Sequence, residues 1–185
     1  MSEVKLSIRE RLSEAAAQLF YAEGVRGVGV EAIAKAAQTT KMGLYRHFES
    51  KDALITEWVQ QLVAQYAAVM DRLEADYPDD PRRQLLDFAE FIADDVTRAS
   101  YRGCPFINTI AELPDESHPA RKLIEAHKAR QLRRLGALCA KAGAAEPKLA
   151  AIHLTLLLEG AQTAAQNRSV PRLREHLPKL VDAVL

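Results

Sequence analysis

The sequence has few of the residues that build disulfide frameworks, turns and strands. Its 185 residues include two cysteines, Cys104 and Cys139, which lie far apart and form no CxxC pattern. That usage is untypical of secreted disulfide-rich proteins, so we expect a reducing, cytoplasmic setting. Glycine and proline number only eight each, and apolar residues recur at helical rather than strand spacing almost throughout. The sequence therefore predicts an all-α fold.

Metal-binding and membrane-spanning patterns are also missing. No two of the histidines, His47, His118, His127, His153 and His176, stand four residues apart, which argues against a zinc site. The charged N-terminal segment lacks the apolar core of a signal peptide, and no uncharged apolar run of about 18 residues follows it. A chain of this length buries a core without a metal ion, so we expect no metal and no cofactor.

Positive charge is not in excess overall, because 25 basic residues balance 25 acidic ones. Its distribution is nevertheless uneven. Between Lys35 and Lys51 four basic residues face one acid, whereas between Asp71 and Asp95 nine acids face three arginines. A molecule with a basic end and an acidic body still orients towards phosphate.

Capping signals and apolar spacing predict the helices. Ser7 and Glu10 form a capping box that opens a helix from Ile8 to Glu23. Two short helices follow, from Val30 to Ala37 and, capped by Thr40, from Lys41 to Phe48. Leu12, Phe20, Ile33, Leu44 and Phe48 give these three helices a small core.

The rest of the chain predicts a larger helical region. Ser50 caps a long helix that ends near Tyr77, and Asp80 with Pro81 opens the next, to about Ser100. A short apolar segment from Phe106 to Leu113 follows. Further helices are expected to run from Ser117 to Gly143, from Pro147, and from Pro171 to the C-terminus.

Two short helices joined by about four residues, the second one polar, describe a helix-turn-helix whose second helix enters a major groove. Leu44 and Phe48 face the core of this unit, which leaves Thr40, Arg46 and His47 near its surface. Any solvated helix carries some basic side chains, so the spacing alone leaves an ordinary helical surface as an alternative.

The run IAKAAQTTKMGLYRHFESKDAL, preceded by LFYAEGVRGVGVEAIA, resembles the DNA-binding domain of the TetR family of transcriptional repressors. LYRHF followed by SKDAL is the most specific part. The resemblance implies a two-domain, all-α homodimer, with a DNA-binding domain at residues 5–50 and a ligand-binding and dimerisation domain at 51–185. It also implies a palindromic operator, a small-molecule ligand that releases the repressor, and no enzymatic activity.

The resemblance also assigns roles to single residues. Thr40 matches the cap of the recognition helix, Lys41 and Met42 match base-reading positions, and Tyr45 matches a phosphate-contacting tyrosine. The full expected DNA-binding set is Thr39, Thr40, Lys41, Met42, Gly43, Tyr45, Arg46, His47 and Lys51.

Four positions depart from the family pattern. Gln38 replaces the usual turn glycine, Thr39 the usual valine, and Gly43 the usual Thr or Ser, while Gly29 stands where a capping Ser or Thr is usual. Glutamine tolerates positive φ poorly, which puts the usual left-handed turn in doubt. Gly43 lets a backbone approach DNA closely, so we expect readout there to differ from the family norm.

The C-terminal region mixes apolar and polar residues in a way that suits either a ligand cavity or a filled core, and residue by residue a filled core is favoured. His153 stands on a helix that is apolar nearly all round, so we expect it to be buried. The candidate pocket residues are Trp58, Leu62, Tyr66, Phe88, Phe91, Ile92, Phe106, Asn108, Glu112, His127, Gln131 and His153.

The helix opened by Pro147 has more apolar surface than one contact covers, and a second subunit is the simplest cover. The expected dimer interface comprises Leu149, Ile152, Leu156, Leu157, Gly160, Ala161 and Ala164. By contrast, the six basic residues between Arg121 and Arg134 suit a solvated outer face better than a nucleic-acid patch.

Two other functions stay open at this point. A helical enzyme would use Cys104 as nucleophile and His127 or His153 as base, although no motif supports it. A dimeric ligand-binding or interaction module that has lost specific DNA binding is kept open by Gly29, Gln38 and Gly43.

Overall fold

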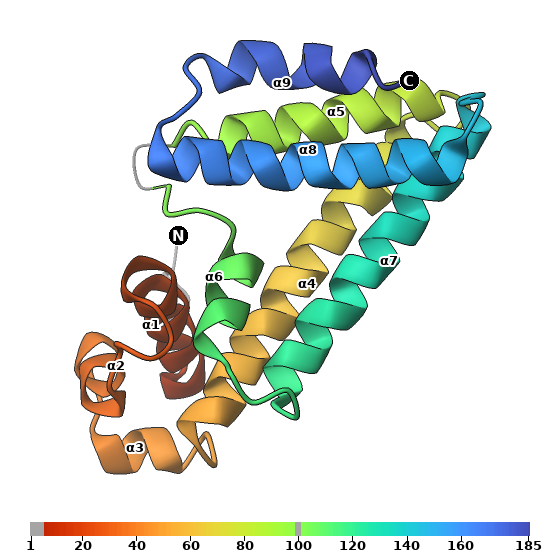
Figure 1. Cartoon of the computed structure of the whole chain (residues 1–185). Helices are drawn as coiled ribbons and strands as arrows, with labels where there is room; N and C mark the ends of the chain where they lie inside the picture. Colours follow the sequence, from red (N-terminus) through yellow and green to blue (C-terminus); the bar gives the residue numbers. More distant parts are fainter. Residues whose placement is uncertain (1–5, 99–100) are drawn as a thin grey trace, which may run out of the picture. The chain divides into compact units, whose positions relative to one another are not determined.

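The computed structural model describes residues 6–98 and 101–185, and within these ranges the chain forms nine helices and no strand (Figure 1). The all-α prediction is confirmed. None of the helices in the described ranges combines the length and apolar composition that a bilayer-spanning segment needs. The helices are α1 (Ile8–Glu23), α2 (Val30–Ala36), α3 (Lys41–Tyr45), α4 (Lys51–Asp76), α5 (Pro81–Asp95), α6 (Pro105–Glu112), α7 (Pro119–Lys141), α8 (Pro147–Asn167) and α9 (Leu173–Asp182).

These helices form two compact units. The first comprises the chain up to Val63 together with residues 105–124, and the second comprises residues 64–104 and 125–185. The long helices α4 and α7 therefore contribute residues to both units, and α6 belongs to the first. The predicted functional division at residues 50 and 51 stays a prediction.

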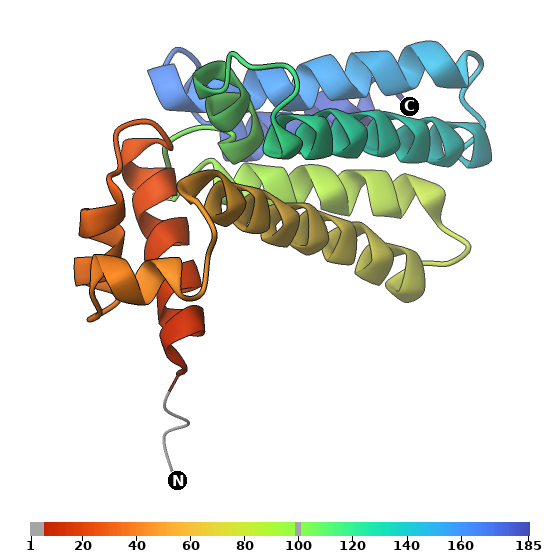
Figure 2. The ribbon, with the colours of Figure 1, turned by 90° about the horizontal axis from the view of Figure 1, so that it is seen from below.

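The first unit is built around the predicted core. Leu12, Phe20, Ile33, Leu44 and Phe48 are all buried, and Trp58 of α4 packs on Phe20 with ring centroids 5.5 Å apart. The capping box is also confirmed, since the Glu10 amide donates to Ser7 Oγ at 3.2 Å and the Ser7 amide to Glu10 Oε2 at 2.7 Å. Figure 2 shows α1, α2 and α3 together from below.

Two predicted helices end early. In α3 the last turn tightens after Tyr45, because the His47 amide donates to Leu44 O at 2.9 Å over a three-residue step. The helix expected to reach Ser100 ends at Asp95, where the hydroxyl of Thr97 donates to Asp94 O at 2.9 Å and competes with the helical pattern. Ser100 itself lies outside the described residues.

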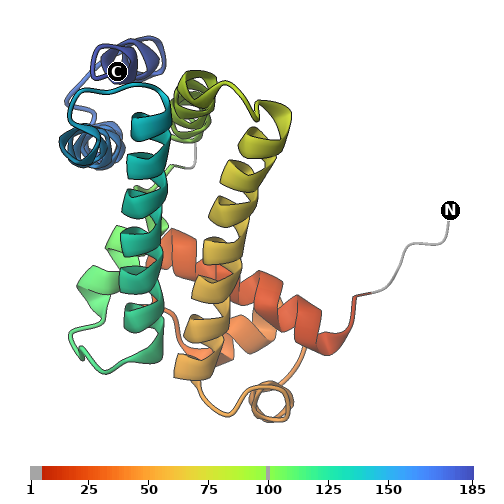
Figure 3. The same ribbon diagram turned by 90° about the vertical axis from the view of Figure 1, so that its right-hand side faces the viewer.

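The second unit has its own core, formed mainly by α5, α8 and α9, which lie side by side in Figure 1. Phe88, Leu135, Leu154 and Leu177 are among its most deeply buried side chains. In Figure 3 α4 and α7 run alongside each other, and in this unit Arg134 of α7 is ion-paired at 2.9 Å with Glu74 of α4. Arg134 thus takes part in surface ion pairs, in agreement with a solvated outer face.

Candidate nucleic-acid interface

The turn that ends α2 keeps the left-handed residue that a helix-turn-helix needs. Gln38 has φ of 53°, and the amides of Gln38 and Thr39 donate to Lys35 O at 3.1 Å and Ala34 O at 2.9 Å. This bond pair is the Schellman arrangement, which closes a helix with a left-handed residue. Arg11 Nε adds a bond to Ala37 O at 3.0 Å. The doubt raised by glutamine is therefore removed, because local and tertiary bonds hold the turn.

Replacing Gln38 with glycine is expected to stabilise the protein. A left-handed L-residue costs about 1–2 kcal/mol, and glycine removes that cost while adding about 0.4–1 kcal/mol of unfolded-state entropy. We expect the free energy of unfolding in urea to rise by roughly 0.5 kcal/mol. Gln38→Ala keeps a Cβ and is the control. An equal gain in both variants would show that the backbone conformation is not the cause.

The recognition helix α3 begins as predicted at Thr40, whose Oγ1 accepts a hydrogen bond from the Gly43 amide at 3.0 Å. Leu44 and Phe48 are buried beneath it, whereas Met42 is 68% exposed and Tyr45 is 43% exposed. The side chains at Thr40, Lys41, Arg46 and His47 are exposed as well. Donors and one apolar side chain therefore share the solvent face of α3, which is the composition that base and phosphate contacts require.

The geometry of α3 explains why glycine occupies position 43. A Cβ built at Gly43 would lie 2.3 Å from the Thr39 hydroxyl oxygen, so the Thr39 side chain fills that space. Thr39 and Gly43, two of the departures from the family pattern, thus fit each other across one turn. The unusual pair is a local packing solution at the start of the recognition helix.

Lys41 has an acidic partner that the sequence analysis missed. Its Nζ donates to Glu31 Oε1 at 2.7 Å, joining α3 to the first turn of α2. This bond raises the pKa of Lys41 and lowers the pKa of Glu31, and the charge of each partner adds to the effect. The two residues stand on different helices across the turn, so only the folded geometry reveals the pair. A neighbouring negative charge therefore offsets part of the lysine's attraction for phosphate.

Replacing Glu31 with glutamine is expected to raise DNA affinity. The change removes a negative charge beside the DNA-facing surface and leaves Lys41 fully available to phosphate. We expect binding to tighten by roughly threefold to tenfold at low salt, and the slope of log affinity against log salt to steepen by about 1. Fluorescence anisotropy over a salt series measures both, with Glu90→Gln in the second unit as the charge-matched control. Unchanged affinity and slope would mean that Lys41 does not approach phosphate.

The start of α4 completes this surface. Ser50 caps it as predicted, accepting a bond from the Ala53 amide at 3.0 Å, and Lys51 beside it is half-buried. Arg9 of α1 lies over the Phe48 ring, 5.0 Å from its centroid, and is ion-paired with Glu57 of α4. Arg9 and Glu57, which were not predicted from the sequence, therefore tie α1 to α4.

The predicted pocket residues are divided between the two units. Trp58, Leu62, Phe106, Asn108 and Glu112 belong to the first unit, and the others to the second. In the second, Tyr66 meets the Phe91 ring edge-on at 5.6 Å and the His127 ring edge-on at 6.0 Å. Beside this cluster is a cavity of about 10 Å³, lined by Tyr66, Ile92, Lys128, Gln131, Leu135, Thr155, Leu158, Glu159 and Gln162.

The lining of this cavity includes polar residues that the sequence analysis did not select. Thr155, Glu159 and Gln162 follow one another at helical spacing on α8, and Gln162 is buried. Lys128 of α7 reaches Glu159 Oε1 at 3.0 Å. The sequence did contain a pattern that indicates this polar lining, because three polar residues fall on one face of an otherwise apolar helix.

The two histidines of the predicted pocket differ. His127 is buried, and burial, reinforced by the charges of Lys128 and Arg130, lowers its pKa to about 4. His153 is exposed on α8, so the expectation that it is buried was wrong. It was misplaced because α8 turns an apolar face outward, and an apolar surrounding in sequence does not reveal which side meets solvent.

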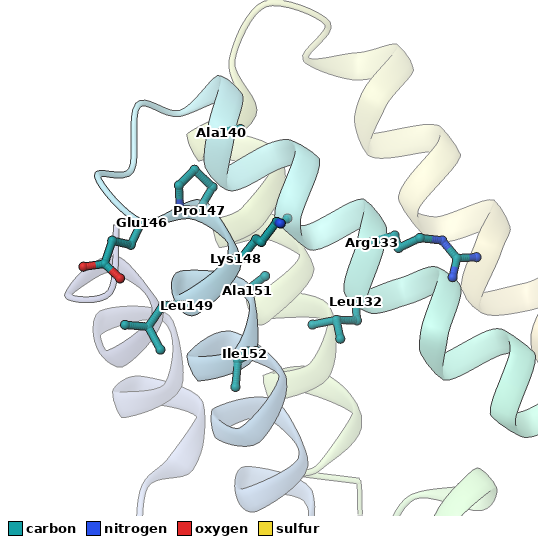
Figure 4. A pocket seen from close by; sticks show the side chains of 10 residues that line it. Leu132, Arg133, Ala140, Glu146, Pro147, Lys148, Leu149, Ala151 and Ile152 are labelled. Atoms are coloured by element: carbon teal, nitrogen blue, oxygen red, sulfur yellow. The ribbon is translucent and has the colours of Figure 1, made fainter.

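That outward face carries most of the predicted dimer residues. Leu149, Ile152 and Leu156 are exposed at 44%, 45% and 63%, and Gly160 is also exposed. Leu157 and Ala164 are half-buried, and Ala161 is buried in the unit's own core. An open apolar groove of about 1010 Å³ runs between α7 and α8 (Figure 4). Leu132 of α7 and Ile152 of α8 line this groove from its two helices.

Comparison with known proteins matches this architecture. Residues 12–57 match the family described as bacterial regulatory proteins, tetR family. None of the curated proteins matches the chain. The crystal structure of SCO4454, a TetR-family transcriptional regulator from Streptomyces coelicolor, is 33% identical, with a TM-score of 0.90 over 96% of this chain and 93% of that one.

Two further solved structures are similar to this chain. A putative TetR-type regulator from Streptomyces avermitilis is 33% identical, with a TM-score of 0.80 over 97% of this chain and 98% of that one. The regulatory protein TetR from Rhodobacter sphaeroides, 20% identical over 96% of this chain and 98% of that one, shares the fold with a TM-score of 0.81. With its helix-turn-helix, the chain belongs to the TetR family of DNA-binding transcriptional regulators, which are not enzymes.

Proposed function

We propose that this regulator is a repressor that binds a palindromic operator as a homodimer and leaves it when a small ligand enters the second unit. Two recognition helices must lie about 34–36 Å apart to reach successive major grooves, so a symmetric dimer is what this mode of binding requires. The proposed contacts to DNA are those of Thr39, Thr40, Lys41, Met42, Gly43, Tyr45, Arg46, His47 and Lys51.

The observation that carries the dimer is the apolar stripe of α8. Leu149, Ile152 and Leu156 repeat at helical spacing on its solvent side, beside the groove against α7. Soluble monomers rarely expose a contiguous apolar surface of this kind. A two-fold axis would bring the same stripe from a second copy against it, and both would be covered at once.

Polar and aromatic side chains inside the second unit support the binding of a small ligand. Gln162, Thr155 and the Lys128–Glu159 pair line a small cavity next to the Tyr66, Phe91 and His127 rings. A cavity of about 10 Å³ has room for about one water molecule, so a larger ligand has to displace side chains to enter. Aromatic walls with a few polar groups are typical of small-molecule sites, and such displacement would couple binding to a change of shape.

A DNA-binding titration tests this proposal. Purified protein is titrated against the DNA upstream of its own coding sequence, with unrelated DNA of equal length as the control, between 50 and 200 mM salt. We expect specific binding by the dimer, weakened by salt, and reduced transcription from the bound promoter in vitro. Equal affinity for both DNAs would exclude the operator, and increased transcription would exclude repression.

A further inference from the structure

Glu112, the last residue of α6, binds the connection between α1 and α2. Its Oε2 accepts a hydrogen bond from the backbone amide of Arg26 at 2.7 Å, across 86 positions of sequence. From the sequence, Glu112 was expected to be one of the polar groups of a ligand pocket. The structure instead directs its carboxylate to the backbone of the helix-turn-helix unit.

The connection has a space into which this carboxylate fits. A Cβ built on Gly24 would lie 2.3 Å from Glu112 Oε1 and 2.8 Å from Oε2, so the carboxylate occupies the place of a side chain. Gly24 ends α1 with φ of 85°, a conformation that glycine adopts without strain. Two independent requirements, one conformational and one steric, therefore select glycine at this position.

The carboxylate completes the anchoring of the connection. Val25 and Val28 are 2% and 1% exposed, so the core of the unit holds the chain on both sides of Arg26. Between these anchors, the Arg26 amide is held by Glu112. The connection leads directly into α2, which contains the acid that pairs with Lys41 and is followed by the turn at Gln38. A fixed connection therefore fixes the orientation of the two helices that face DNA.

We propose that Glu112 is a positioning residue for operator recognition, which holds the α1–α2 connection so that α2 and α3 meet base edges in one register. The inference rests on operator binding by this regulator. The bond lies at the surface, where water can satisfy the Arg26 amide once the carboxylate is removed, so we expect its loss to loosen the connection locally rather than to unfold the unit. Its effect is expected on discrimination between DNA sequences, which depends on where the side chains of α3 lie to within fractions of an ångström.

The first test uses the free protein, without DNA. Amide hydrogen exchange at Arg26 is compared in the native chain, Glu112→Ala, Glu112→Gln and the control Glu116→Ala, which removes a charge from an exposed position nearby. We expect exchange of the Arg26 amide to accelerate by about tenfold in Glu112→Ala, less in Glu112→Gln, and not in the control. Equal exchange in all four proteins would overturn the proposal, whether or not the native chain binds an operator.

The second test measures discrimination. For each variant the ratio of operator affinity to affinity for unrelated DNA is determined, with the active fraction set by stoichiometric titration. We expect Glu112→Ala to lower this ratio by about fivefold, with partial recovery in Glu112→Gln, which keeps an acceptor of similar size. A loss of affinity that is equal for both DNAs would indicate a merely structural role and overturn the proposal. Failure of the native chain to discriminate would instead refute operator binding itself.

Discussion

Leu156→Asp is expected to make the regulator monomeric and to weaken operator binding by more than about 100-fold. Leu156 is 63% exposed and is the last residue of the apolar stripe of α8, one turn after Ile152. In the proposed dimer it is covered by the second copy. A carboxylate placed there without a partner would have to be desolvated, which costs several kcal/mol per ion. The symmetry of the interface doubles the cost, because each copy contributes one aspartate.

The loss of DNA affinity follows from geometry. A monomer presents one recognition helix, and the gain from joining two half-site contacts, typically about 10²–10⁴ in affinity, disappears. Sedimentation velocity at micromolar concentration measures the oligomeric state, and anisotropy with the operator measures affinity. Gln65→Asp adds the same charge at an exposed position of α4 and is expected to change neither. A Leu156→Asp protein that stays dimeric and binds normally would place the interface elsewhere.

The parts of the fold that could be predicted depend on local interactions. The capping box at Ser7 and Glu10, the Thr40 cap and the Asp80–Pro81 start involve residues within one turn of each other, so the sequence displays both partners. The exposure of the α3 side chains could be predicted for the same reason, because α3 is short and Leu44 is the one buried residue among its five. Local patterns of this kind need no knowledge of the tertiary structure.

The parts that could not be predicted depend on distant contacts. The left-handed turn at Gln38 is supported by the bond from Arg11 to the carbonyl of Ala37, 26 positions later in the chain, and Glu112 reaches Arg26 across 86 positions. In α8 the usual rule is partly reversed, because Gln162 is buried whereas Leu156 is exposed. A rule that places apolar residues inside fails on such a helix, and an apolar face that a second copy covers would account for the failure.

Acid is expected to destabilise the second unit through His127. Burial in the protein lowers the pKa of this histidine from its ordinary 6.5 to about 4, with Lys128 and Arg130 contributing through their charges. The unfolded chain therefore binds a proton near pH 6.5, whereas the folded chain binds it only near pH 4. Between these values the unfolded state holds more protons, so the free energy of unfolding falls as the pH falls. Protonation of His127 is expected to lower the free energy of unfolding by on the order of 3 kcal/mol, and this loss is complete below the folded-state pKa of about 4.

His127→Gln isolates this contribution, because glutamine stays neutral throughout the range. Urea unfolding of the native and variant proteins at one protein concentration, from pH 7.5 to 4, gives the difference in unfolding free energy at each pH. We expect the native protein to lose stability relative to the variant as the pH falls from about 6.5 to about 4, and the difference to be constant above pH 7.5. His176→Gln, at an exposed position of α9, is the control and should follow the native profile. Parallel profiles for the native protein and His127→Gln would show that His127 is protonated equally in both states. A confirmed difference would establish a neutral imidazole beside Tyr66 in the folded regulator.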